Sequence, residues 1–505
     1  MRRPLNDTMK KARAALIAAM ALPVAACTVG PNYKPATPAA LGVPAAYSVS
    51  ADGSTRGDFR QWWTQFSDPL LTSLVEQARA QNLDLAQSVA RLRQAHEALI
   101  ASRAALFPGV SGSAGYSRSF NLAGGTNTVT LPDGTVTSIS RSNNSFSISG
   151  DVSYQADLFG GTRRSIEASK AQYQGAGYDY ASVLTSTESE VARNYILARL
   201  AQAQLANARA SLGIEDDNLQ IAQWRVQAGL VSSVDVEQAR ASRAQTAATI
   251  PSLEQSYNEA VSNLGILTGQ APGALKDAMA KAEPIPQGPP SIAVGIPADT
   301  LRQRPDVMSA ERNLAAATAE IGVAKAALYP ALDITGNIGT SANVFNDLFK
   351  LITGSVFAGI SQTIFDGGRL HAQVRSNEAA AEGAFALYKS TVLTGLQDVE
   401  NAVVALNSAK EREKQFAIAY DAANNSAILA RAQYRAGLTD FTTLNTAESS
   451  LLSARNGLSQ AKSDEATAIV QLYLALGGGW DSATVPTAAN TPPIIPAATS
   501  PSEDR

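Results

Sequence analysis

Apolar and polar residues alternate without interruption over residues 146–158. Side chains in such a segment point alternately to the two faces of a β-strand. One face would carry Phe146, Ile148, Gly150, Val152, Tyr154, Ala156 and Leu158, and the other Ser145, Ser147, Ser149, Asp151, Ser153, Gln155 and Asp157. The length suits a transmembrane β-strand, which needs roughly 9–11 residues.

Three further segments continue this pattern: 110–117, 332–339 and, with apolar residues on both faces, 356–365. We therefore expect two β-hairpins, at about 109–158 and about 331–365, with polar, glycine-containing tips at 121–144 and 341–354. A soluble antiparallel sheet would show the same alternation, but the small hydroxyl residues of the polar face also suit a water-filled lumen. Bacterial single-chain barrels need about eight strands or more, and an open sheet edge cannot stand in hydrocarbon. Four strands in a membrane therefore require several copies of the chain in one barrel.

A second pattern has a period of seven. Leucine, valine and alanine recur at positions 184, 191, 198, 205, 212, 219 and 226, beside a mostly small series at 187, 194, 201, 208 and 222. This is a heptad seam that allows helices to pack closely. No proline interrupts residues 133–250, so one helix over about 163–228 would be roughly 100 Å long at 1.5 Å per residue.

This periodicity stops at Ala228-Gly229-Leu230. In the second half of the chain, the helical pattern is interrupted at Ala436-Gly437-Leu438. Glycine just after a helix favours a left-handed C-cap, so each site should be the tip of a helical hairpin.

The two halves of the chain repeat each other. Residues 82–108 align with 304–330 without a gap, and Leu158-Phe159-x-Gly161-x-Arg163 matches Ile364-Phe365-x-Gly367-x-Arg369. A repeat of this length sets the architecture. We expect a first repeat at 62–270, a proline-rich connector at 271–303, a second repeat at 304–479 and a disordered tail at 480–505.

Particular residues should mark the element boundaries. Pro108, Gly161, Pro330 and Gly367 are expected at the junctions between strands and helices. Arg304-Pro305-Asp306 should begin a helix, because proline suits the first helical position and an acidic residue suits the first turn.

Composition and charge exclude several function classes. The 505 residues carry a net charge of −3, which gives no reason to expect a nucleic-acid partner. The two histidines, His96 and His371, lie far apart and have no cysteine pair beside them, so we expect neither a metal site nor another cofactor. The sequence has no P-loop, no Gly-x-Ser-x-Gly elbow and no recognisable catalytic constellation, and we predict that the protein is not an enzyme.

The first 26 residues read as a signal peptide: basic residues precede a short apolar run that is too short to span a bilayer. Leu22-Pro23-Val24-Ala25-Ala26-Cys27 resembles a bacterial lipobox, which implies a covalent lipid on Cys27, the sole cysteine. Residues 27–61 would then form a lipidated, extended N-terminal segment. Thr28 follows the cysteine, where an Asp would resemble an inner-membrane retention signal. Translation from Met9 would give a more typical signal length.

Several motifs together carry a family resemblance. They are Cys27-x-x-Gly30-Pro31-x-Tyr33-x-Pro35, Trp62-Trp63-x-x-Phe66-x-Asp68-Pro69-Leu70, Gly295-x-Pro297, Leu301-x-x-Arg304-Pro305-Asp306-Val307, Ala310-Glu311 and Ala327-x-Tyr329-Pro330. They resemble the outer-membrane efflux protein family, the TolC-like channels, and within it the lipoprotein branch that serves resistance–nodulation–division pumps.

The resemblance implies a mainly α fold with membrane β-strands. Three copies would form a twelve-stranded outer-membrane β-barrel continued by a long α-helical periplasmic barrel. The homotrimer would be lipid-anchored in the outer membrane and project into the periplasm. A periplasmic adaptor (membrane fusion) protein would dock at the hairpin tips, Gly229, Leu230, Gly437 and Leu438, and an inner-membrane pump would supply the energy.

The periplasmic aperture is expected at Thr442, Thr446 and Ser449, which share one helix face. Similar family members often carry Asp where this chain has Thr446 and Arg where it has Ser449. A hydroxyl ring lacks the pH-sensitive repulsion of an Asp ring. We expect a gate held by packing at the tips, with Asp440 or Glu448 as the nearest charges; ordinary polar surface residues are the alternative.

The function implied is a passive exit duct for small molecules. An outer-membrane conduit for type I-like protein secretion is the alternative. A purely structural lipoprotein rod would explain the helices and the lipid, but it would leave the alternating hairpins unexplained.

Overall fold

The computed structural model describes residues 28–49, 59–120, 128–130, 132–138, 142–483 and 485–486. The chain divides into two compact units, each made from three stretches. The first takes residues up to Lys34, His96–Gln172 and Asn313–Ala384, and the second takes the remaining residues.

The two halves of the chain contain elements of equal length. Helices α4 (Leu83–Ala104) and α9 (Pro305–Ala326) have 22 residues each. Helices α5 (Gly161–Gln227) and α10 (Arg369–Arg435) have 67 each. Helices α6 (Ser233–Leu267) and α11 (Phe441–Ala475) have 35 each. The strands that follow α4 and α9, β1 (Gly109–Phe120) and β5 (Ala331–Ala342), have 12 each.

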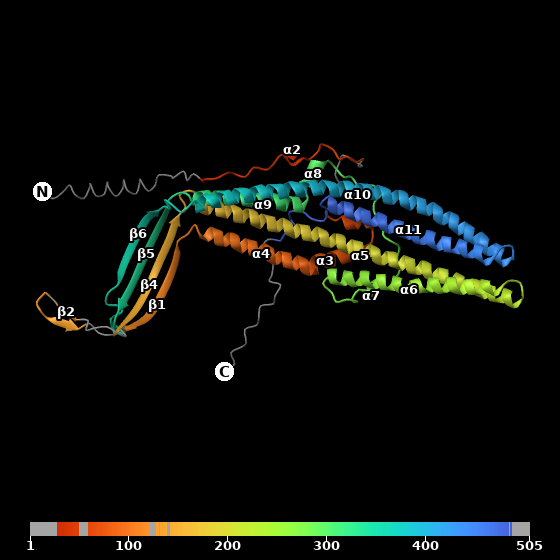
Figure 1. Ribbon diagram of the computed structural model, residues 1–505, viewed down its shortest axis with the longest axis horizontal. Coiled ribbons are helices and arrows are strands. Elements are labelled where there is room, and N and C mark those ends of the chain that lie inside the picture. Colours follow the sequence, from red (N-terminus) through yellow and green to blue (C-terminus); the bar gives the residue numbers. More distant parts are fainter. Residues whose placement is uncertain are drawn as a thin grey trace. The chain divides into compact units, whose positions relative to one another are not determined.

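The first unit contains an antiparallel sheet with the order β1-β4-β5-β6, where β4 is Ser142–Ala156 and β6 is Thr353–Ser361 (Figure 1). The two predicted hairpins are β1–β4 and β5–β6, and the β4–β5 ladder joins them into one sheet. Two strand ends differ from the prediction: β4 stops at Ala156 instead of residue 158, and β6 stops at Ser361 instead of residue 365. The tips also contain a small ladder, β2 (Thr128–Thr130) with β3 (Val136–Ser138), and a short 3-10 turn, η2 (Phe345–Asp347).

The registers put like residues side by side across the sheet. One row runs from Val110 to Val152, Gly336 and Val356. A row on the opposite face runs through Ser113, Ser149, Gly339 and Thr353. Because successive side chains alternate in direction, the sheet has one largely apolar face and one face of small polar residues.

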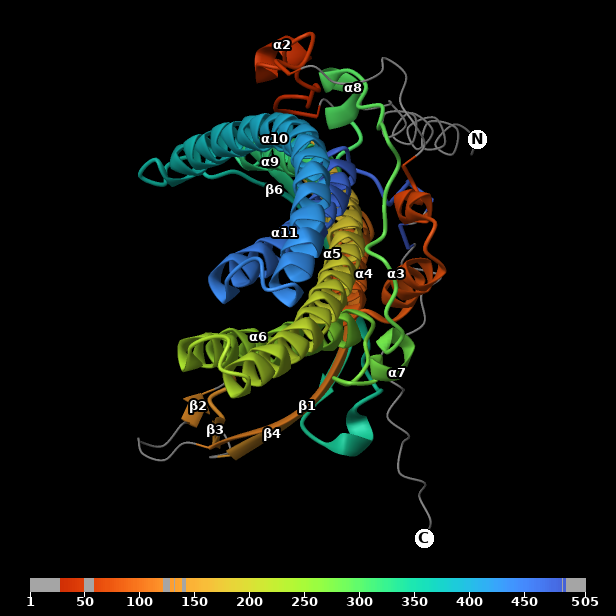
Figure 2. The same cartoon turned by 90° about the vertical axis from the view of Figure 1, so that its right-hand side faces the viewer.

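The second unit is built around a core of large buried side chains. Its short elements are α2 (Pro38–Leu41), η1 (Trp62–Phe66), α3 (Pro69–Gln81), α7 (Lys276–Met279) and α8 (Pro297–Leu301). Trp62, Leu71, Tyr195, Leu264 and Tyr473 are among its fully buried residues. Figure 2 shows the helical hairpins α5–α6 and α10–α11, each turning back at its tip.

Local chemistry explains where the helices of this unit begin. The Asp68 side chain accepts hydrogen bonds from the backbone N–H groups of Leu70 and Leu71, and Pro69 occupies the first helical position of α3. The predicted helix start at Pro305 is confirmed, since α9 begins at that residue.

The heptad seam of α5 is buried along most of its length. Leu184, Val191, Ala198 and Leu205 are all 7% exposed or less, as a packed seam requires. Towards the tip, Leu212, Leu219 and Val226 are only partly covered in the single chain.

Three segments contain ordered structure: the predicted extended N-terminal segment, the proline-rich connector and the start of the tail that was predicted to be disordered. The N-terminal segment includes helix α2. The connector contributes Ile285, Ile292 and Val294 to the main core. The tail was predicted to be disordered from residue 480, yet Trp480 packs edge-to-face against Tyr178, 6.0 Å between ring centroids, and its indole N–H donates to the Gln303 carbonyl. These contacts order the start of the tail because a tryptophan has a large apolar surface to bury.

Candidate functional site: sheet, junction and hairpin tips

The apolar face of the sheet is open to its surroundings in the single chain. Val110, Ile338 and Val356 are 77%, 63% and 85% exposed. Exposed apolar surface of this extent marks an interaction site. The opposite face is polar and carries a direct side-chain bond, in which the Asn337 amide donates to Asp151 at 2.6 Å. None of the helices in the described residues is both long and apolar enough to cross a membrane.

Both outer strands lack a neighbour on one side. Among the described residues, β1 pairs only with β4 and β6 pairs only with β5. Unpaired strand edges present N–H and C=O groups that a further strand can bind. The sheet is therefore open at two edges.

Three of the predicted junction residues lie at element boundaries, whereas Gly367 lies within the link between β6 and α10. Pro108 and Pro330 directly precede β1 and β5, and Gly161 begins α5. The sequence motif aligns Gly161 with Gly367, but these two residues do not occupy equivalent positions in the structure. Gly160 and Gly368 have positive φ angles of 81° and 90°, and each accepts the first backbone bond of its long helix. The sequence motif is therefore displaced by two residues relative to the structural correspondence.

Next to this junction, the start of the N-terminal segment is docked onto the first unit. The guanidinium of Arg164, a buried residue, donates to the carbonyls of Val29 and Gly30 at 3.1 and 3.2 Å and to the side chain of Asn32 at 2.7 Å. The Val29 N–H in turn donates to the Phe159 carbonyl at 3.2 Å. These charge-assisted hydrogen bonds hold the backbone of residues 29–32 in one defined position.

Glycines make this close approach possible. A Cβ atom built on Gly30 would lie 2.5 Å from Cα of Gly322, and one on Gly160 would collide with Thr28. Cys27 lies outside the described residues, but Thr28, its neighbour in the sequence, rests against Gly160, the residue directly before α5. The sequence analysis missed Arg164 and Gly322; the Gly30 motif was the one signal that pointed to this contact.

The hairpin tips have the geometry expected from their glycines. Gly229 and Gly437 have φ angles of 71° and 76°. The N–H of Leu230 donates to the Arg225 carbonyl, and that of Leu438 to the Gln433 carbonyl, both at 2.9 Å. These are Schellman caps. Leu230 and Leu438 project from the turns with 69% and 78% of their surface exposed.

The last turns of α5 and α10 contact each other. Arg225 lies over the Tyr434 ring, 4.6 Å from its centroid, and donates to the Tyr434 carbonyl at 3.3 Å. Tyr434 packs edge-to-face against Phe441, the first residue of α11. The two tips are therefore linked within one chain.

The aperture candidates lie together on an exposed face of α11. Thr442, Thr446 and Ser449 are all exposed, and the Thr446 hydroxyl donates to the Thr442 carbonyl at 2.8 Å. The charges expected nearest to them have other roles. Asp440 caps α11 by accepting from the Thr443 N–H, and Glu448 is buried in an ion pair with Arg431.

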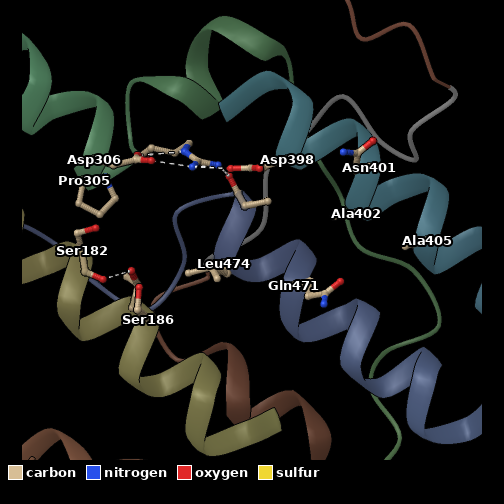
Figure 3. A pocket seen from close by; sticks show the side chains of 13 residues that line it. Ser182, Ser186, Pro305, Asp306, Asp398, Asn401, Ala402, Ala405, Gln471 and Leu474 are labelled. Atoms are coloured by element: carbon tan, nitrogen blue, oxygen red, sulfur yellow. Dashed lines mark hydrogen bonds and ion pairs between the residues drawn. The ribbon is translucent and has the colours of Figure 1, made fainter. Parts of the chain in front are cut away.

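The second unit also contains a cavity of about 470 Å³ near the start of α9 (Figure 3). Arg304 forms ion pairs with Asp306 at 2.7 Å and Asp398 at 2.9 Å, and it donates to the Ala475 carbonyl. These bonds tie α9, α10 and α11 together. Because both carboxylates already pair with Arg304, this arrangement is structural.

Comparison with known proteins decides the identity. The sequence profile of the family described as "Outer membrane efflux protein" matches residues 74–270 and 296–478. The chain belongs to the outer membrane efflux protein family. The efflux protein is 30% identical over 462 residues to nodulation protein T of Rhizobium leguminosarum bv. trifolii, covering 90% of this chain and 95% of the relative.

Two further similarities agree with this membership. The pyoverdine export outer membrane protein OpmQ of Pseudomonas aeruginosa is 30% identical over 445 residues, covering 88% and 92% of the two chains. The solved outer-membrane channel OprN is 32% identical, with a TM-score of 0.80, covering 90% of this chain and all of that one. The predicted fold class, the outer-membrane efflux function and the prediction that the protein is not an enzyme are thereby confirmed.

Proposed function

We propose that three copies of this efflux protein form the outer-membrane exit duct of a tripartite efflux system. The observation that carries the proposal is the sheet with an exposed apolar face and two unpaired edges. Strands can stand in a bilayer only when every edge is paired. Three four-stranded sheets would give twelve strands, which lies within the range of outer-membrane barrels.

A lipid on Cys27 would anchor the duct. This rests on the lipobox and on the docking of Thr28 against Gly160, at the end of the link from β4 to α5. The acyl chains would then enter the membrane beside the barrel. Replacing Cys27 with Ser should abolish metabolic labelling by palmitate, and a variant that still takes up the label would reject this anchor.

The exposed tip residues Leu230 and Leu438 would dock a periplasmic adaptor, which in turn contacts an inner-membrane pump. Energy would come from that pump, because the chain carries no nucleotide-binding motif. The relative named for pyoverdine export supports a small-molecule cargo.

The test combines conductance with genetics. The purified protein in a planar bilayer should form channels, and Thr446→Asp should raise cation selectivity if the exposed face of α11 lines the pore. Unchanged conductance and selectivity would place this face outside the pore. Deletion with plasmid rescue should give hypersensitivity to a class of antibiotics, detergents, dyes, organic acids or metal salts; loss of a secreted protein instead would favour the protein-secretion alternative.

A further inference from the structure

A second cavity of the second unit, about 500 Å³ in volume, lies between the three helices α5, α10 and α11. It adjoins the cavity at the start of α9, because Ala405 and Gln471, both labelled in Figure 3, line the two of them. A volume of this size suits a small organic molecule. We call it the three-helix cavity.

The three-helix cavity lies on the side of α5 that faces away from the main core. Val191, Tyr195 and Ile196 of α5 are fully buried in that core, which also contains residues of η1, α3 and the connector. Arg193 and Leu197 line the cavity instead, and they share a helix face because they are four residues apart. Arg193 is exposed, and Leu197 is 40% exposed.

Several polar side chains around the three-helix cavity have no hydrogen-bond partner in the described part of the chain. Arg193 makes neither an ion pair nor a hydrogen bond there, and Ser463 has a hydroxyl without a partner although its surface is only 1% exposed. The same holds for Ser408, Thr467 and Gln471. Polar groups in such an enclosed place normally have a partner, so water or a ligand must supply it.

The charge of the lining favours an anion. Asp464 is the only carboxylate that lines the cavity among the described residues, and it already accepts from Arg412 and from Gln460, both at 2.8 Å. Arg193 therefore remains as a positive charge without compensation. The apolar part of the lining consists of Leu197, Ala405, Ala409 and Ala468.

We propose that the three-helix cavity binds an amphipathic organic anion. The Arg193 guanidinium would hold the acidic group, since its N–H donors match the geometry of a carboxylate. The hydroxyls of Ser463 and Thr467 would donate to the same group, and Leu197 would contact the apolar body. The inference rests on the proposed duct and names a cargo class for it, because the side of α5 away from the core is the side that can border the passage.

Equilibrium dialysis against the full protein in lipid nanodiscs tests the site, with empty nanodiscs as the blank. The probes are 1-naphthoate, an anion with an apolar ring system, and 1-naphthylmethylammonium, a cation with the same ring system. Naphthoate should bind more tightly than the ammonium. Arg193→Gln should weaken the binding of naphthoate about tenfold and remove the preference for the anion, because a charge-assisted pair is lost.

The matched control is Arg209→Gln, which removes the same charge from the same helix. Arg209 pairs with Glu254 and does not line the three-helix cavity. It lies about 24 Å further along α5, so salt should screen its effect and leave the affinity within about twofold. Ser408→Trp keeps every charge and places a large side chain at an exposed position of the lining, and it should abolish the binding of naphthoate.

Planar-bilayer recordings on the same preparations separate this inference from the proposed function. Open channels together with equal binding of the two probes, or with naphthoate binding that Arg193→Gln and Ser408→Trp leave unchanged, would overturn the anion site and leave the duct intact. An equal loss in Arg209→Gln would also overturn the site, since any positive charge on the helix would then serve. Absence of channels would overturn the proposed function, whatever the probes bind.

Discussion

The docking of the N-terminal segment makes a quantitative prediction for Arg164→Met. The substitution keeps an apolar stem and removes a guanidinium that makes three hydrogen bonds to residues 29–32. Hydrogen bonds from a charged donor contribute about 1.5–3 kcal/mol each. Water can replace some of the lost hydrogen bonds, because Gly30 is exposed and Val29 is partly exposed. We expect the segment to lose about 3 kcal/mol of docking free energy, which raises its open population about a hundredfold.

Hydrogen exchange of the peptide covering residues 28–34 measures this opening. The Val29 amide is the sensitive probe, since it donates to the Phe159 carbonyl in the docked state. Arg163→Met is the matched control: its guanidinium bonds to Asp157 and to none of residues 29–32 in the contacts of the described chain. Unchanged protection of Val29 in Arg164→Met would refute the reasoning, as would an equal loss in the control.

Three further predictions concern the helical hairpins. Gly229→Ala should destabilise the hairpin tip by about 1–2 kcal/mol, because φ of Gly229 is 71°. Gly213→Ala, in the interior of α5, should instead stabilise this helix by about 0.5–1 kcal/mol. Hydrogen exchange in the last turns of α5 compares the two variants. Glu448→Ala should cost about 3 kcal/mol in thermal or denaturant unfolding, because it removes a buried carboxylate and leaves the partly buried Arg431 without its ion-pair partner; Glu237→Ala, in an exposed pair, should cost less than about 0.5 kcal/mol, and equal costs would contradict this. Burial and a neighbouring carboxyl raise the pKa of the Glu465 side chain to about 7, so its contribution to stability is present below about pH 4.5 and lost as the pH rises through about 7. Glu465→Gln should flatten that part of the stability–pH curve, and an unchanged curve would reject the assignment.

Most element types followed from local pattern. The 67-residue helices, the alternating strands and the glycine caps at the tips are properties of short stretches of chain, because periodicity and backbone preference act within a few residues. The strand ends were less well predicted. Residues 362–365 continue the apolar pattern of β6 but form no strand in the single chain, since pairing depends on a neighbour that the pattern does not contain.

The roles of charged residues were the least predictable from the sequence. Glu448 was expected as a charge near the aperture, yet it faces Arg431, 17 residues away on the adjoining helix. Arg164 had no motif of its own. A charged side chain takes its role from the partners that the fold brings within reach, and those partners are distant in the sequence.

The sequence by itself determined the duplication, the length and kind of each repeated element, and the family. These depend on the order of residue types, and two copies of one pattern fold into the same elements. Only the tertiary structure decided that Gly160 corresponds to Gly368, that β4 joins β5 in one register, and that a buried arginine holds the N-terminal segment. Each of these is a contact between distant residues, where hydrogen-bond geometry and close packing choose among alignments that the sequence leaves equal.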